Sequence, residues 1–183
     1  VADMTEEIYY KFFALHQKLK KNHEVIGKKP VLLLDVTSGG LGFTGWQNGS
    51  LLFQNNIASG RLSILEHFTK EERSDIMFPS AVRDYIHAAL SPLWGSIEHA
   101  KIHTLVLSGF EARIFASLLS RKKDTSPIQI DPDAFLSMTT SLIPLTTRKL
   151  MHEFNLNEQR AKLLLPTLLL YEEVVRTMHI ESI

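Results

Sequence analysis

The chain has 183 residues, of which 44% are hydrophobic and 22% are charged, which predicts one globular domain with its own core. Its 20 Lys and Arg balance 20 Asp and Glu, so there is no basic field to attract nucleic acid. Cysteine is absent, which excludes disulfides and thiolate zinc sites and predicts a cytoplasmic protein. The longest apolar run contains Pro166, so no membrane span is expected.

The first segment predicts an amphipathic helix. Ile8, Phe12, Leu15 and Leu19 recur with the spacing of one helical face. The chain begins at Val1 without an initiating methionine, so we expect a processed or excised piece of a longer protein.

Residues 31–36, with the sequence VLLLDV, predict a buried strand that carries an acid near its end, Asp35. The turn that follows is rich in small residues. Gly39, Gly40 and Gly42 allow positive φ and a close approach to a ligand, and the amides of such a turn can hold an anion. A buried hairpin with a glycine-rich turn explains the same pattern without any ligand.

Three further strands are expected. Residues 43–46 and 50–57 flank Asn48-Gly49, which is a strong hairpin signal, and residues 103–107 form another apolar run that reaches a glycine. The order β-β-β-α-β-α predicts an α/β domain with a mixed sheet, in which 31–36 pairs in parallel with 103–107. This plan is similar to that of actin-like (ribonuclease H-like) domains.

The rest of the chain predicts helices, and those of residues 131–183 form a C-terminal helical cluster. Asp131 and Asn157 are typical caps for helices that run to Leu142 and toward His179. The other expected segments are a helix over 81–99 with a kink at Pro92, a loop over 120–126 and a helix over 145–154.

Four short motifs occur in order: DVTSGGLG at 35–42, a glycine and then ILEHF within 60–68, GFEAR at 109–113, and RAKLLLP at 160–166. They resemble the second domain of the exopolyphosphatase and guanosine pentaphosphate phosphohydrolase (Ppx/GppA) family. The corresponding family motifs are roughly Asp-Ile-Gly-Gly-Gly-Ser-Thr-Glu, Glu-Arg-Phe after a short apolar helix, Gly-Gly-Thr-Ala-Arg, and Arg-Ala before an apolar run and a proline.

The resemblance implies a hydrolase of phosphoanhydrides that acts on polyphosphate or a guanosine polyphosphate with a divalent cation such as Mg²⁺. It implies that Asp35 holds this metal ion or positions water. The phosphate-binding residues it implies are Ser38, Gly39, Gly40, Gly109 and Arg113. A first domain with its own phosphate loop and base is expected to be absent from this chain, so that domain or a second copy of the chain is the expected partner.

The departures from the family motifs bear on activity. Thr37 and Ser38 stand for two loop glycines, Gly42 for a glutamate, and Phe110 for a glycine of the third motif. We therefore expect the isolated chain to be inactive. The alternative is a non-catalytic actin-like module for sensing or protein interaction. The family's final strand would begin just after Ser182, which predicts one uncovered sheet edge.

Packing explains several residues that also suggest function. Trp46 and Trp94 can stack a base, but their positions favour packing, and Met138 and Met151 are expected in the core. Arg160 precedes an apolar run and is expected to pair with a buried carboxylate. The eight histidines show no spacing typical of a metal site.

Overall fold

The computed structural model describes residues 28–119 and 128–183, together with six positions of the N-terminal segment, among them Lys11 and Ala14. The predicted face of Ile8, Phe12, Leu15 and Leu19 and the predicted loop over 120–126 lie outside this part of the chain. The elements are β1 (Val31–Val36), β2 (Leu41–Gln47), β3 (Ser50–Ile57), α2 (Arg61–Glu66), η1 (Glu72–Ser74), α3 (Phe78–Ile97), η2 (Glu98–Ala100), β4 (Thr104–Leu107), α4 (Phe110–Leu119), α5 (Pro132–Leu142), α6 (Thr147–Phe154) and α7 (Glu158–Thr177).

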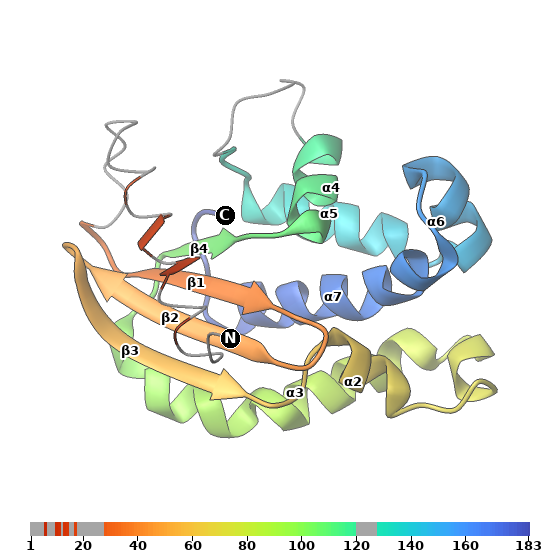
Figure 1. Ribbon diagram of the computed structural model, residues 1–183, viewed down its shortest axis with the longest axis horizontal. Helices are drawn as coiled ribbons and strands as arrows, with labels where there is room; N and C mark the ends of the chain where they lie inside the picture. The colour runs from red at the N-terminus through yellow and green to blue at the C-terminus, as the bar shows by residue number, and fades with distance from the viewer. Residues whose placement is uncertain (1–5, 7–9, 12, 15–16, 18–27, 120–127) are drawn as a thin grey trace.

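The four strands form one mixed sheet in the order β3-β2-β1-β4 (Figure 1). β1 is antiparallel to β2 and parallel to β4, with Val31 opposite Thr104 and Leu34 opposite Leu107. Asn48 and Gly49 both have positive φ, at 53° and 79°, as a tight hairpin turn requires. The predicted meander and the predicted parallel pairing are therefore confirmed.

The outer edge of β4 is partly covered by the end of the chain. The Leu105 amide donates to the Ser182 carbonyl at 2.9 Å, and Thr104 forms a parallel bridge with Ser182. Ile183 exchanges two backbone hydrogen bonds with Ile130. The prediction of an uncovered edge is wrong at these residues, because unpaired backbone groups of β4 find partners in the last residues of the chain.

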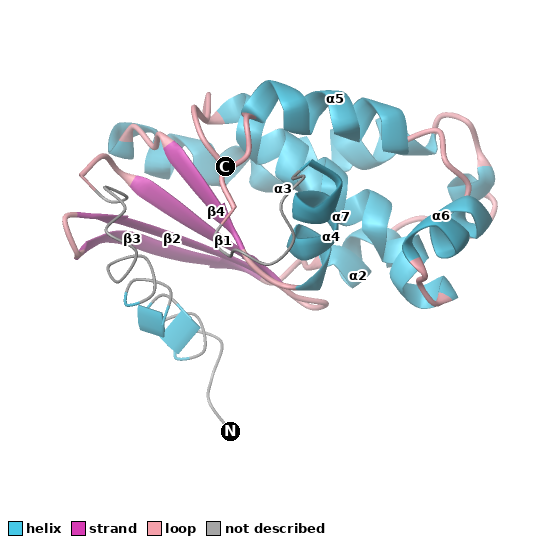
Figure 2. Cartoon of the chain, turned by 90° about the horizontal axis from the view of Figure 1, so that it is seen from above, coloured by secondary structure: helices cyan, strands magenta, loops and turns pink. Residues whose placement is uncertain are grey.

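Alternate residues of β1 point to opposite faces of the sheet. Leu32 and Leu34 belong to the large core under the helices, whereas Val31 and Leu33 pack with Trp46 on the other face. Figure 2 shows α3 and α7 gathered on one side of the sheet. Because side chains alternate along a strand, Asp35 belongs to the face of Val31 and Leu33, opposite these helices.

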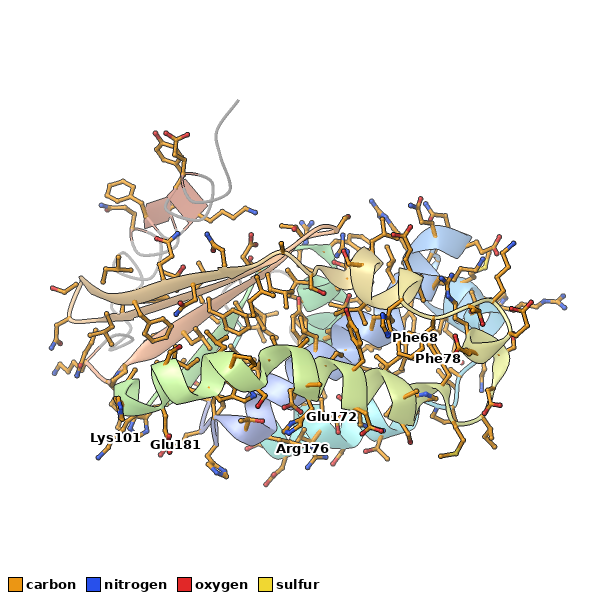
Figure 3. The ribbon with its side chains drawn as sticks, turned by 90° about the horizontal axis from the view of Figure 1, so that it is seen from below. Phe68, Phe78, Lys101, Glu172, Arg176 and Glu181 are labelled. Carbon is orange, nitrogen blue, oxygen red and sulfur yellow. The ribbon has the colours of Figure 1, made fainter. Side chains whose placement is uncertain are left out.

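A buried carboxylate joins α7 to α3. Glu172 Oε2 accepts hydrogen bonds from Arg83 Nε at 3.1 Å and Nη2 at 3.0 Å, and its Oε1 accepts from Arg176 Nε at 3.0 Å. Figure 3 shows Glu172 and Arg176 side by side below α3. These bonds fix α7, and α7 carries Tyr171 into the core next to Phe115.

The predicted helix signals are largely confirmed. Asp131 accepts a hydrogen bond from the Ala134 amide and Asn157 accepts one from the Arg160 amide, each at 2.9 Å. α3 starts three residues before its predicted beginning and continues through Pro92 as one helix. α6 starts at Thr147, where Thr146 provides the cap, and α7 ends at Thr177, before the predicted His179.

The aromatic and sulfur side chains pack as expected. Trp46 is 1% exposed, and Trp94 meets Phe43 edge to face at 6.2 Å between ring centroids. Met138 is in the core, and Met151 packs against it. Within the described part of the chain, no helix combines the length and the apolar character needed to cross a bilayer.

Candidate functional site

A pocket of about 480 Å³ opens at the ends of β1 and β4, beside the first residues of α2 and α4. In open sheets ligands bind at the carboxyl ends of parallel strands, which is where this pocket lies. The side chains that give it chemical character are Lys11, Asp35, Arg61, Ser108, Phe110 and Glu111.

Asp35 lies at the floor of this pocket and is 5% exposed. Its Oδ2 is 2.9 Å from the Lys11 ammonium, and its Oδ1 accepts a long hydrogen bond of 3.4 Å from the Ser108 hydroxyl. Burying a carboxylate is costly unless it is paired, so Lys11 supplies the charge that makes this position tolerable. The acid that the sequence singled out is therefore neutralised within the chain.

The turn after β1 closes on itself. The Thr37 amide donates to the Gly40 carbonyl, and the Gly40 amide donates to Thr37 Oγ1, both at 2.9 Å. Gly39, Gly40 and Gly42 do not take the positive φ that glycine allows. The glycines of the described chain with positive φ are Gly49 and Gly109. Gly42 lies within β2, and the hydrogen bonds of Thr37 hold the turn without a left-handed residue.

The carbonyls of the same turn bind the start of α2. The Arg61 amide donates to the Thr37 carbonyl and the Leu62 amide to the Ser38 carbonyl, each at 3.1 Å. Gly60 makes this approach possible, because a Cβ there would lie 2.5 Å from both carbonyl oxygens. The sequence marked Gly60 only as part of a motif, and its role as a contact point between turn and helix was missed.

The pocket holds a buried ion pair that sequence reasoning also missed. Arg61 Nη1, from the first residue of α2, pairs with Glu111 Oε2, from the first turn of α4. Their side chains are 20% and 6% exposed. The available signal was that each charged residue follows within two positions of a glycine that opens a helix, Gly60 or Gly109.

The electrostatics of the pocket reach Tyr171 on α7, which is 1% exposed. Burial raises the pKa of the Tyr171 hydroxyl above its usual value, and the nearby Glu111 carboxylate raises it further. Arg61 lowers this pKa and Asp35 raises it. The phenol therefore stays neutral in the folded protein over the ordinary pH range.

We expect the Tyr171→Phe variant to lose less stability than the parent chain above about pH 10. The pKa of Tyr171 is raised in the folded protein, so the unfolded chain loses the hydroxyl proton at a lower pH than the folded one. The free energy of unfolding of the parent chain is therefore unaffected by this group below about pH 10 and decreases as the pH rises above it. For one proton, the free energy of unfolding decreases by at most about 1.4 kcal/mol per pH unit. Denaturant unfolding of both proteins from pH 8 to 11 measures it, and identical slopes would contradict the assignment.

The start of α4 brings two predicted residues to different places. Gly109, with φ of 101°, lines the pocket together with Phe110. Arg113 is exposed and is not part of the pocket lining, because two residues after Glu111 correspond to about 200° around a helix. Its predicted contact with phosphate, like those of Ser38, Gly39, Gly40 and Gly109, stays a prediction.

Arg160 has another partner than the one predicted. It is exposed, and its guanidinium lies 4.1 Å from the centroid of the Phe110 ring. The expected pairing with a buried carboxylate is therefore wrong, because α7 begins beside the start of α4 and offers the guanidinium an aromatic face. Phe110 lines the pocket, and Arg160 lies against its ring.

Among the described residues, the donor set at Asp35 lacks the several oxygen ligands that a divalent cation needs. The Lys11 ammonium lies 2.9 Å from Oδ2 and so occupies a place at which a cation could bind this oxygen. Throughout the described chain, no three His, Cys, Asp or Glu side chains are grouped closely enough to hold a metal ion. In this arrangement the residues do not fit Mg²⁺, which prefers several oxygen ligands.

Comparison with known proteins identifies relatives by structure. No family model matches the chain, and no curated protein matches it. The solved structures that are similar in fold include the following three. An exopolyphosphatase from Cytophaga hutchinsonii is 16% identical with a TM-score of 0.74, and the match covers 84% of this chain and 52% of that one.

The second is the Aquifex aeolicus member of the Ppx/GppA family, 13% identical with a TM-score of 0.71, where the match covers 90% of this chain and 54% of that one. The third is an exopolyphosphatase-like protein, 10% identical with a TM-score of 0.73, where 87% and 55% are covered. The chain thus spans about half the length of these proteins. At identities this low, the structural likeness shows the fold alone. The chain has a Ppx/GppA-like α/β fold with a mixed sheet and a C-terminal helical cluster.

Proposed function

We propose that this chain is part of a Ppx/GppA-type phosphatase and that its pocket binds a phosphate group of polyphosphate or of a guanosine polyphosphate. We further propose that the chain by itself binds without hydrolysing. One observation supports this most directly: both carboxylates of the pocket are in ion pairs, Asp35 with Lys11 and Glu111 with Arg61.

Hydrolysis needs a base that takes a proton from water, a contribution worth about 10² to 10⁴-fold in rate. A carboxylate oxygen already bound to an ammonium or guanidinium is poorly placed to do so. Phe110 also occupies room at the pocket, next to the turn of Gly109. Lys11 and Arg61 line the pocket and are cations that can bind phosphate oxygens.

Polyphosphate titration with and without Mg²⁺ tests binding and activity on the same samples. We expect no phosphate release above the buffer rate, together with weak binding, in the millimolar range, that shifts amide resonances of 37–40 and 109–111 first. Phe110→Gly should strengthen the shifts because it opens the pocket. Release that Asp35→Asn abolishes would overturn the inactive assignment.

The alternative, a non-catalytic module for sensing or protein interaction, is favoured by the turn of residues 37–40. Its carbonyls bind α2 and its Gly40 amide binds Thr37, so few of its groups face a ligand. In that case polyphosphate would leave 37–40 and 109–111 unshifted. A first domain of the Ppx/GppA kind or a second copy of the chain is then the proposed partner, and the proposed location is the cytoplasm.

A further inference from the structure

The ion pair between Arg61 and Glu111 has an unusual position, because it lines a pocket while being largely shielded from water. The two residues come from helices far apart in the sequence, α2 and α4. Neither the sheet nor the helix packing requires a charge there, since the neighbouring core positions Ile64 and Phe115 are apolar. A buried pair of this kind is weak evidence for stability, so a role in binding deserves a test.

The Arg61 guanidinium is only partly used. Nη1 contacts Glu111, whereas Nε is buried and has no hydrogen-bond partner among the described residues. A buried donor without a partner costs free energy. The planar fork of arginine matches two oxygens of a phosphate, which a single carboxylate oxygen of Glu111 does not use fully.

The charges that line the pocket balance. Lys11 and Arg61 are positive, Asp35 and Glu111 are negative, and these are the charged side chains of the lining in the described part of the chain. An anion that enters therefore meets no net attraction and competes with the Glu111 carboxylate for Arg61. Removing the charge of Glu111 leaves two cations against one carboxylate, a net charge of +1.

We propose that Arg61 is the anion-binding side chain of this pocket and that Glu111 is its internal ligand, which a phosphate group must displace. This rests on the proposed function insofar as it concerns the same pocket. Glu111 thus sets the affinity of the pocket: it keeps Arg61 in place when no phosphate is bound and makes the binding of phosphate weak.

Inorganic phosphate is the probe, titrated at constant ionic strength into the parent chain and three variants. Glu111→Gln removes the charge and keeps the shape. Arg61→Gln/Glu111→Gln also removes the cation. Asp133→Asn is the matched control, because Asp133 lies exposed in the first turn of another helix, α5. Amide shifts and the unfolding temperature are both recorded as functions of phosphate concentration.

We expect Glu111→Gln to bind phosphate about tenfold or more tightly than the parent chain. Its unfolding temperature should rise with phosphate, because the anion replaces the missing carboxylate. The double variant should lose this gain, and Asp133→Asn should behave as the parent. If Glu111→Gln does not fold without phosphate, its folding on addition of phosphate supports the proposal in the same way. Glu111→Ala is then measured as the second variant.

Equal affinities of the parent and Glu111→Gln would overturn the proposal, as would a double variant that keeps the gain. These outcomes are separate from those of the proposed function. A parent chain that binds polyphosphate while Glu111→Gln gains nothing overturns only the internal ligand. A parent chain that does not bind polyphosphate, beside a Glu111→Gln variant that binds phosphate through Arg61, overturns only the proposed function of the unmodified pocket.

Discussion

The Gly60→Ala variant is expected to lose about 3 kcal/mol or more of its free energy of unfolding. A methyl group at this position would lie 2.5 Å from the carbonyl oxygens of Thr37 and Ser38, which are backbone atoms and cannot rotate away. The turn and α2 would have to separate. This breaks the hydrogen bonds from the Arg61 and Leu62 amides, each 3.1 Å long in the parent chain.

Gly39→Ala is the matched control in the same turn. A Cβ at Gly39 meets nothing within 4 Å, and its φ is not positive, so we expect a change within about 0.5 kcal/mol. Urea unfolding of both variants, followed by circular dichroism, gives the two values. Equal losses for Gly60→Ala and Gly39→Ala would show that the contact between turn and α2 does not hold the pocket together.

Local sequence patterns predicted most of the fold. The four apolar residues before Asp35, the Asn48-Gly49 hairpin and the caps at Asp131 and Asn157 are each determined by a few neighbouring residues, and all appear in the structure as predicted. The parallel pairing of β1 with β4 followed from topology, because a connection through helices brings two buried strands side by side.

The candidate site was harder to predict because its contacts join distant segments. Asp35 was found from its place at the end of a buried strand, but its partner Lys11 lies 24 residues earlier. Arg61 and Glu111 each resemble an ordinary surface charge in the sequence. Only the arrangement of α2 beside α4 reveals that they share a buried position.

Two errors have a common physical cause. The glycines after Asp35 were expected to allow positive φ, and Arg160 was expected to pair with a buried carboxylate because it precedes an apolar run. Thr37 supplies side-chain hydrogen bonds that hold the turn, and Phe110 supplies an aromatic face for Arg160. In both cases the contact is made by a residue that is close in space and that the sequence pattern did not indicate.

The ion pairs of the pocket limit its chemistry more than its shape does. The space at the ends of β1 and β4 is present, as is a turn with Gly109 at positive φ. The pocket carboxylates of Asp35 and Glu111 are paired with Lys11 and Arg61. The free energy of unfolding of variants of one of these pairs therefore measures how strongly its two side chains interact.

Arg61→Met is expected to lose about 3 to 5 kcal/mol of unfolding free energy, because it leaves the Glu111 carboxylate buried without its partner. Arg61→Met/Glu111→Leu should recover most of this loss, since an apolar pair of similar size avoids burying a charge. Urea unfolding of the parent, both single variants and the double variant forms a double-mutant cycle. A loss below about 1 kcal/mol for Arg61→Met would mean that the pair behaves as a surface salt bridge. Glu111 would then be solvated and free to leave Arg61, and the pocket would need no displacement step to admit phosphate.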